Sequence, residues 1–156
     1  ISSKYPTRKQ LNENCVYNKN IYNILKHPGY INMTHDIYHK KYYDNISDYK
    51  GIIISLAEYP LNFIIGKVIE GLGSGCVVFL EESRLYENEL NLEKWVHYVP
   101  IYKTRQDKLI LENHSYMYLI NSDSGKEIAM RGYNHIKQFF NSTTCAKKII
   151  DIIDVY

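Results

Sequence analysis

The chain has 156 residues, a formal net charge of +2 and 23% charged residues. This length suits one domain with its own hydrophobic core and is short for two domains. The near-neutral charge argues against a general nucleic-acid or membrane-surface binder, and no apolar run approaches the roughly 20 residues of a membrane span.

The first residue and the cysteines bear on the origin of the chain and on its cellular compartment. The chain begins with Ile1 rather than methionine, and we interpret it as an excised piece of a longer protein. Cys15, Cys76 and Cys145 are widely spaced and lack metal-ligand spacing. An odd number of separated cysteines is typical of free thiols in a reducing compartment, so we expect a cytoplasmic protein.

Two helices are predicted before residue 50. Residues 1–12 predict the entry of a short helix, and residues 35–46 predict an amphipathic helix with Tyr42 and Ile46 on its apolar side. Between them lies a polar, irregular stretch that ends in a turn at His27-Pro28-Gly29-Tyr30.

The most informative stretch is 50–80, which predicts strand, helix and strand in succession. Ile52 to Ile54 form a β-branched run typical of a strand buried on both faces, and Pro60 suits the first turn of a helix. Apolar residues at helical spacing then form one stripe: Ile64, Ile65, Val68, Ile69 and Leu72. Three glycines are expected to end the helix: Gly71, Gly73 and Gly75. A second strand follows at 76–80, which makes a βαβ unit whose helix N-terminus favours a phosphate.

Beyond the second strand, the sequence predicts a charged loop with a helical turn at 81–94. A third strand is expected at 96–101, with Pro100 marking its end. Three further helices are expected at 107–121, 124–140 and 143–153. Ser142 or Thr143 is a plausible N-cap for the last of them.

Strands that alternate with helices predict an α/β fold. We expect a doubly wound, mostly parallel, Rossmann-like sheet with the C-terminal helices closing one face. No repeat, low-complexity tract or long linker divides the sequence, so residues 1–156 are expected to form a single domain.

Lys67 and Glu70 are the first candidate site residues, because their spacing places them on adjacent turns of the central helix. In the functional interpretation, Lys67 binds a diphosphate and Glu70 accepts hydrogen bonds from a ribose diol. The alternative is a solvated ion pair of little energetic value. Arg8 is a candidate for a bidentate phosphate contact from the other side of the cleft, although a surface arginine is the commoner case.

Other polar residues are weaker candidates for a functional site. His97 lies between apolar strand residues, and we interpret it as packed or edge-exposed rather than as a base. Glu81 and Glu82 follow the second strand, so one of them is a candidate for facing a ligand. A paired-carboxylate hydrolase would require a geometry that spacing alone does not define.

Several segments, in chain order, carry a resemblance to one enzyme family. KVIEGLGSGCVVFL at 67–80 is similar to a helix–glycine–strand element near many sugar-donor sites, and WVHYVPI at 95–101 matches the pattern W-x-H-Y-[IV]-P-[IV]. IAMRG at 128–132 is similar to an I-A-x-x-G helix, and Ser2-Ser3 with Arg8 is similar to a Ser/Arg segment. Together they resemble the C-terminal, donor-binding half of a GT-B type glycosyltransferase of the capsule-associated and protein O-glucosyltransferase family.

The resemblance implies an inverting glycosyltransferase. A sugar would pass from a nucleoside diphosphate sugar, expected to be a UDP-sugar, to a hydroxyl of a protein or glycan acceptor. In the family an arginine on the central helix grips the diphosphate, and Lys67 at the matching position keeps the charge but loses the planar fork. Glu70 matches the second glutamate of the Glu-x7-Glu pair of retaining enzymes, whereas Asn62 replaces the first, which argues against that subclass. The family's general base lies in an N-terminal domain outside this chain, so no catalytic base is assigned here.

The donor-binding residues that we expect are Arg8, Ser55, Tyr59, Asn62, Phe63, Lys67 and Glu70. The helix N-terminus at 60–63, with Arg8 and Lys67, would offset charge on the leaving diphosphate, and residues 55–59 would frame the base or the sugar. Because protein groups neutralise the phosphates in this scheme, neither a metal nor another cofactor is expected. The alternative is a non-catalytic nucleotide-sugar-binding or scaffold domain. A flavodoxin-like signalling module is disfavoured, because no acidic cluster follows the first strand.

Overall fold

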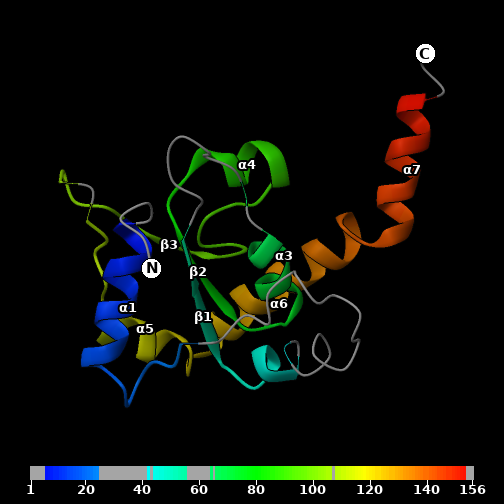
Figure 1. The fold of residues 1–156 in the computed structure, drawn as a ribbon. Coiled ribbons are helices and arrows are strands. Elements are labelled where there is room, and N and C mark those ends of the chain that lie inside the picture. Colours follow the sequence, from blue (N-terminus) through cyan, green and yellow to red (C-terminus); the bar gives the residue numbers. More distant parts are fainter. Residues whose placement is uncertain are drawn as a thin grey trace.

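The structure is a computed structural model that describes residues 6–24, 42, 44–55, 64, 66–106 and 108–153. Within these residues, three strands form a parallel sheet: β1 (Gly51–Ile54), β2 (Val77–Glu81) and β3 (Val99–Ile101). The helices are α1 (Pro6–Tyr17), α3 (Gly66–Gly73), α4 (Arg84–Leu90), α5 (Asn113–Leu119), α6 (Asp123–Phe139) and α7 (Ser142–Ile153). The chain is therefore an α/β fold with helices flanking a parallel sheet (Figure 1).

The strand order is β1-β2-β3, and α3 forms the crossover between the first two strands. Gly51 pairs with Val77 at the start of β1, and Phe79 pairs with Val99 at the start of β3. Pro100 lies inside β3 rather than at its end, opposite Leu80. Among the described strands β3 is an edge strand, the position in a sheet where proline, which has no N–H group to donate, is tolerated.

Successive residues of β2 point to opposite faces and build two separate cores. Val78 and Leu80 pack with Leu72 of α3 and Ile136 of α6, whereas Phe79 belongs to a second core on the other face. Residues of α1 and α5 line that second core: Leu11, Tyr116 and Leu119. Accordingly, Figure 1 shows α1 and α5 on one side of the strands, and α3 and α6 on the other.

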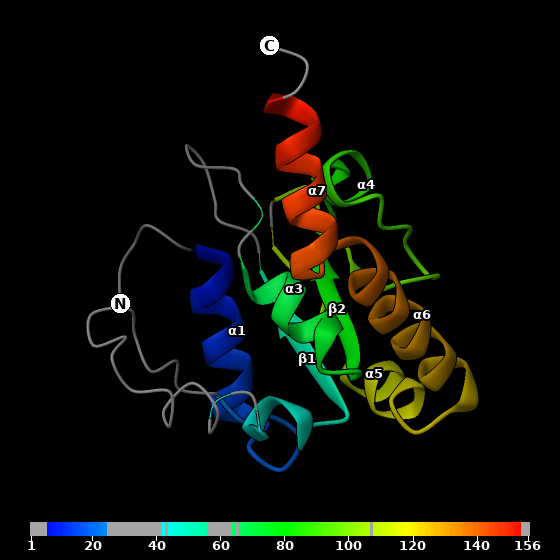
Figure 2. The ribbon, with the colours of Figure 1, turned by 90° about the vertical axis from the view of Figure 1, so that its right-hand side faces the viewer.

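The helix α7 leads away from the body of the structure in both views (Figures 1 and 2). Its N-terminus is capped by Asn141, whose Oδ1 accepts a hydrogen bond of 2.9 Å from the backbone N–H of Thr144. The predicted caps, Ser142 and Thr143, therefore lie one and two positions too late. Asparagine caps helices as well as serine does, so sequence alone did not separate them.

Several element boundaries differ from the prediction. The helical turn expected within the loop at 81–94 is the regular helix α4, which Ser83 caps by accepting a hydrogen bond from the N–H of Leu85. The expected helix at 107–121 shrinks to α5, and Leu109 instead pairs with Lys103 in an isolated bridge. Of the predicted helix at 35–46, the described residues 42 and 44–46 are helical, and Tyr42 and Ile46 are buried.

The glycines after Lys67 do not all end the helix. Gly71 and Gly73 lie within α3, and only Gly75, with φ of 75°, lies beyond it in the left-handed region. Gly71 is needed for packing, because a Cβ there would lie 2.9 Å from Ile54 Cδ1. The absence of a side chain lets α3 approach β1 closely.

A second glycine joins two of the segments that carry the family resemblance. A Cβ on Gly132 of α6 would lie 2.6 Å from the carbonyl oxygen of His97 and 2.8 Å from Leu72 Cδ2. Ile128 and Ala129, on the same helix, are buried. The IAMRG and WVHYVPI segments are therefore in direct contact, and both have a structural role in the packing of α6.

Candidate functional site

The candidate site is built around the first turns of α3. Lys67 is the second residue of this helix, and Glu70 follows one turn later. Because α3 connects two parallel strands, its N-terminus lies at the carboxyl edge of the sheet, where ligands bind in α/β folds. Ser55, directly after β1, is buried at the same edge.

Tyr42 connects the two charged residues of α3. Lys67 Nζ donates a hydrogen bond of 3.4 Å to Tyr42 Oη, which donates one of 3.2 Å to Glu70 Oε2. The Lys67 ammonium also lies 5.6 Å from the centre of the Tyr42 ring, within the range of a cation–π contact. Lys67 and Glu70 therefore face a shared location rather than separate regions of solvent.

The electrostatics of this group favour an anion. Burial lowers the pKa of the Lys67 ammonium; the Glu70 carboxylate raises that pKa, and the nearby positive charge of Arg8 lowers it again. Arg8 in the first turn of α1 is thus close enough to Lys67 for the two cations to repel each other. A phosphate group bound here would be attracted by both the Lys67 ammonium and Arg8.

The structure places four of the seven predicted donor-binding residues: Arg8, Ser55, Lys67 and Glu70. It brings Lys67 and Glu70 together through Tyr42, with Arg8 near Lys67, and it places Ser55 at the end of β1. Tyr59, Asn62 and Phe63 lie outside the described residues, as does Pro60. Sequence reasoning missed Tyr42, which carried no signal beyond its place on an apolar helix side.

Glu81 and Glu82, the two carboxylates after the second predicted strand, are engaged in ion pairs. The Glu81 carboxylate is buried and lies 2.6 Å from Lys103 Nζ, whereas Glu82 forms an exposed pair of 2.8 Å with Lys94. The Glu81 pair holds the ends of β2 and β3 together. These contacts give Glu81 and Glu82 structural partners at the carboxyl edge.

His97 is a packed residue whose hydrogen bond requires an unprotonated Nδ1. Its Nδ1 accepts a hydrogen bond of 2.9 Å from the backbone N–H of Glu93, and its ring lies 4.7 Å from the ring of His135. His135 is itself buried, with Nε2 2.8 Å from the carbonyl oxygen of Leu90. The histidine of the WVHYVPI segment therefore anchors a turn.

Comparisons with known proteins do not assign the chain to a family. No protein-family model matches the chain, and no curated protein matches it. Every helix in the described part of the chain is too short or too polar to traverse a bilayer. Within the same residues, His, Cys, Asp and Glu side chains form no group of three or more that suits a metal ion.

Protonation of His97 is expected to destabilise the fold. Burial lowers the pKa of His97 below its usual 6.5, and the neighbouring His135 and Arg131 lower it further, against the opposing effect of Glu93. A depressed histidine pKa means that stability is fully present above about pH 6.5 and is lost as the pH falls through the folded-state pKa. Protonated Nδ1 also loses its ability to accept the Glu93 N–H.

The variant His97→Asn tests this expectation, because an amide oxygen can replace the Nδ1 acceptor without titrating. The free energy of unfolding of both proteins is measured by urea denaturation at several pH values between about pH 8 and about pH 5. Wild type should lose more stability than the variant on acidification. Parallel pH profiles would show that His97 is not held neutral by its surroundings.

Proposed function

We propose that this chain is the donor-binding half of an inverting, GT-B type glycosyltransferase with a doubly wound, Rossmann-like fold. It would bind a nucleoside diphosphate sugar, expected to be a UDP-sugar, for transfer to a hydroxyl of a protein or glycan. The observation that carries the proposal is the Lys67–Tyr42–Glu70 group at the start of α3, with Arg8 nearby. The free thiols of Cys15, Cys76 and Cys145 are in keeping with a reducing, cytoplasmic compartment.

Each member of this group has a distinct role in the proposal. Lys67 and Arg8 offset the charge that grows on the leaving diphosphate, and the N-terminal dipole of α3 adds to that effect. Tyr42 holds the Lys67 ammonium in place on one side and Glu70 on the other. Glu70 accepts hydrogen bonds from the ribose diol through its remaining carboxylate lone pairs. Phosphate neutralisation by these protein groups needs no metal, and the general base would come from a predicted N-terminal domain.

Calorimetric titration with UDP tests the role of Lys67. Hydrogen bonds to charged groups contribute about 1.5–3 kcal/mol, so Lys67→Ala should weaken UDP binding by roughly 10- to 100-fold. Lys67→Arg, which restores the planar fork, should bind at least as tightly as wild type. Lys126→Ala is the matched control, because it removes one lysine that pairs with Asp123 at the exposed start of α6.

Equal UDP affinity of wild type and Lys67→Ala, with both proteins folded, would contradict the proposal. The alternative, a non-catalytic nucleotide-sugar-binding domain, is favoured if UDP binds but no sugar is released. This second measurement uses a UDP-sugar and a protein that carries the chain together with the predicted upstream domain.

A further inference from the structure

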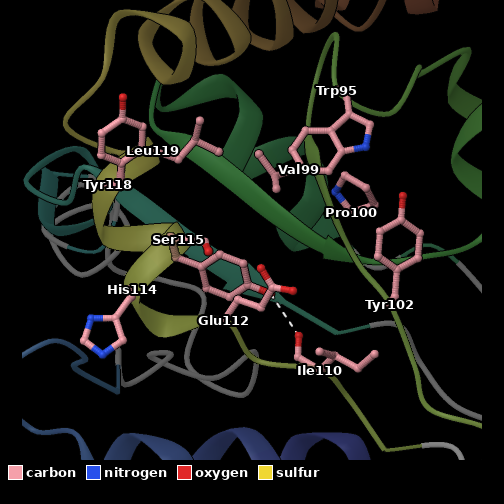
Figure 3. A pocket seen from close by; sticks show the side chains of 11 residues that line it. Trp95, Val99, Pro100, Tyr102, Ile110, Glu112, His114, Ser115, Tyr118 and Leu119 are labelled. Carbon is pink, nitrogen blue, oxygen red and sulfur yellow. Dashed lines mark hydrogen bonds between the residues drawn. The ribbon is translucent and has the colours of Figure 1, made fainter.

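A separate pocket lies on the other side of the sheet from α3, between β3 and α5 (Figure 3). Its volume is about 540 Å³, which is within the range of small-molecule sites. Val99 and Pro100 of β3 form one wall, and Leu119 of α5 forms part of the other. The hydroxyl of Tyr116, a lining residue, donates a hydrogen bond of 3.1 Å to the carbonyl oxygen of Ile110 and so fixes α5 to the preceding segment.

Aromatic rings at the rim of this pocket are unusually exposed. Trp95 is 51% exposed, Tyr102 is 40% exposed and Tyr118 is 77% exposed. Figure 3 shows Trp95 and Tyr102 on the β3 side and Tyr118 on the α5 side of the pocket. Large rings of this kind supply apolar faces together with a polar N–H or O–H group at the edge. The rim therefore offers flat stacking surfaces on both sides of one hollow.

The backbone at Trp95 is an independent indication that this side chain has a role. Its φ is 64°, in the left-handed region that bulky residues rarely occupy. The conformation is held by a hydrogen bond of 2.8 Å from the Trp95 N–H to the carbonyl oxygen of Tyr98. Strained, non-glycine residues of this kind cluster at ligand sites. About half of the Trp95 surface is exposed, so part of the indole is accessible to a ligand.

The polar groups of the pocket indicate the charge of its ligand. Glu112 is the acidic residue of the lining, Ser115 and His114 add polar groups, and no lysine or arginine belongs to the described lining. The carboxylate of Glu112 lies between Tyr102 and α5 (Figure 3). The Glu112 carboxylate accepts hydrogen bonds from hydroxyl groups but repels phosphate, and the Ser115 hydroxyl can accept or donate a hydrogen bond. The pocket therefore differs in sign from the Lys67 group.

We propose that this pocket binds a neutral oligosaccharide. The C–H faces of pyranose rings are apolar and stack on aromatic rings, whereas their rims carry hydroxyl groups that need acceptors such as Glu112 and Ser115. Trp95 and Tyr118 would stack on sugar units at opposite ends of the hollow, and Glu112 would accept hydrogen bonds from sugar hydroxyl groups (Figure 3). The saccharide site shares no residue with the Lys67 group, so it does not depend on nucleotide-sugar binding.

The fluorescence of Trp95 provides a direct test, because the chain has one tryptophan. Titration with neutral tetrasaccharides of glucose, xylose, mannose and N-acetylglucosamine should change its emission in a saturable manner with at least one of them. Tyr118→Ala and Glu112→Gln retain the reporter and should each weaken the response at least about fivefold. Tyr17→Ala is the matched control, since Tyr17 is 86% exposed at the end of α1 and does not line the pocket. It should bind like wild type.

Two further measurements make the outcome decisive. Trp95→Gly relieves the positive φ and should remain folded, but it should lose the saccharide-dependent rise in unfolding temperature. A response to tetramethylammonium without a response to any saccharide would overturn the proposal in favour of a cation site. The absence of any saturable saccharide response, or equal affinity of wild type, Tyr118→Ala and Glu112→Gln, would also overturn it. Failure of UDP binding would leave this result unaffected.

Discussion

Gly132→Ala is expected to lower the free energy of unfolding by about 2–3 kcal/mol, as overpacked core substitutions commonly do. The added Cβ would lie 2.6 Å from the carbonyl oxygen of His97, a backbone atom that cannot rotate away. The His97 backbone is itself held by a hydrogen bond of 2.9 Å to the carbonyl oxygen of Glu93. Helix α6 would therefore have to move off α3 and the 95–98 turn. Urea denaturation measures the loss.

Gly73→Ala provides the matched control for this prediction. Gly73 is also helical, but a Cβ there would lie 4.0 Å from Ile136 Cγ2, an ordinary van der Waals contact. Alanine is preferred over glycine in helices by about 1 kcal/mol, so this variant should be neutral or slightly stabilised. Equal stability of Gly132→Ala and Gly73→Ala would contradict the close approach of α6 to the His97 carbonyl oxygen.

Lys103→Ala is expected to destabilise the fold by about 2–3 kcal/mol, because it removes the cation that lies 2.6 Å from the buried Glu81 carboxylate. The side chain of Glu81 is only 5% exposed, so water cannot replace the lost partner fully. The double variant Glu81→Gln with Lys103→Met should recover most of the loss, since it leaves no buried charge. Urea denaturation of the single and double variants measures the coupling.

The neighbouring pair of Glu82 and Lys94 serves as the control. Its separation of 2.8 Å is similar, but both side chains are well exposed. Exposed ion pairs contribute little, so Lys94→Ala should leave stability within the error of the measurement. Equal effects of Lys94→Ala and Lys103→Ala would show that Glu81 does not rely on its partner.

The elements that the sequence predicted well are those with a strong local pattern. The β-branched run at Ile52–Ile54 and the apolar stretch after Cys76 became β1 and β2, and α6 differs from the predicted helix by one residue at each end. Alternation and helical periodicity report burial directly, since they need only the identity of nearby residues. Elements with weaker sequence patterns were predicted less well. The segment at 108–112 was predicted to be helical but is not, and Leu109 within it pairs with Lys103.

The candidate site was predictable only in part. Lys67 and Glu70 belong to one helix, so their spacing predicted a shared face. Tyr42 lies 25 residues before Lys67, and no local pattern indicates that its hydroxyl lies between the two charged groups. The same holds for the pocket beside β3, which Trp95 and α5 line together although a strand and a loop separate them in the sequence.

The sequence by itself determined the α/β class, the central crossover and the position of two charges on one helix, because each depends on the spacing of neighbouring residues. The tertiary structure decided which distant groups meet: Tyr42 with Lys67, Gly132 with His97, and Glu81 with Lys103. These contacts depend on how helices pack across the sheet. Packing is set by the simultaneous fit of many side chains, and no short stretch of sequence contains that information.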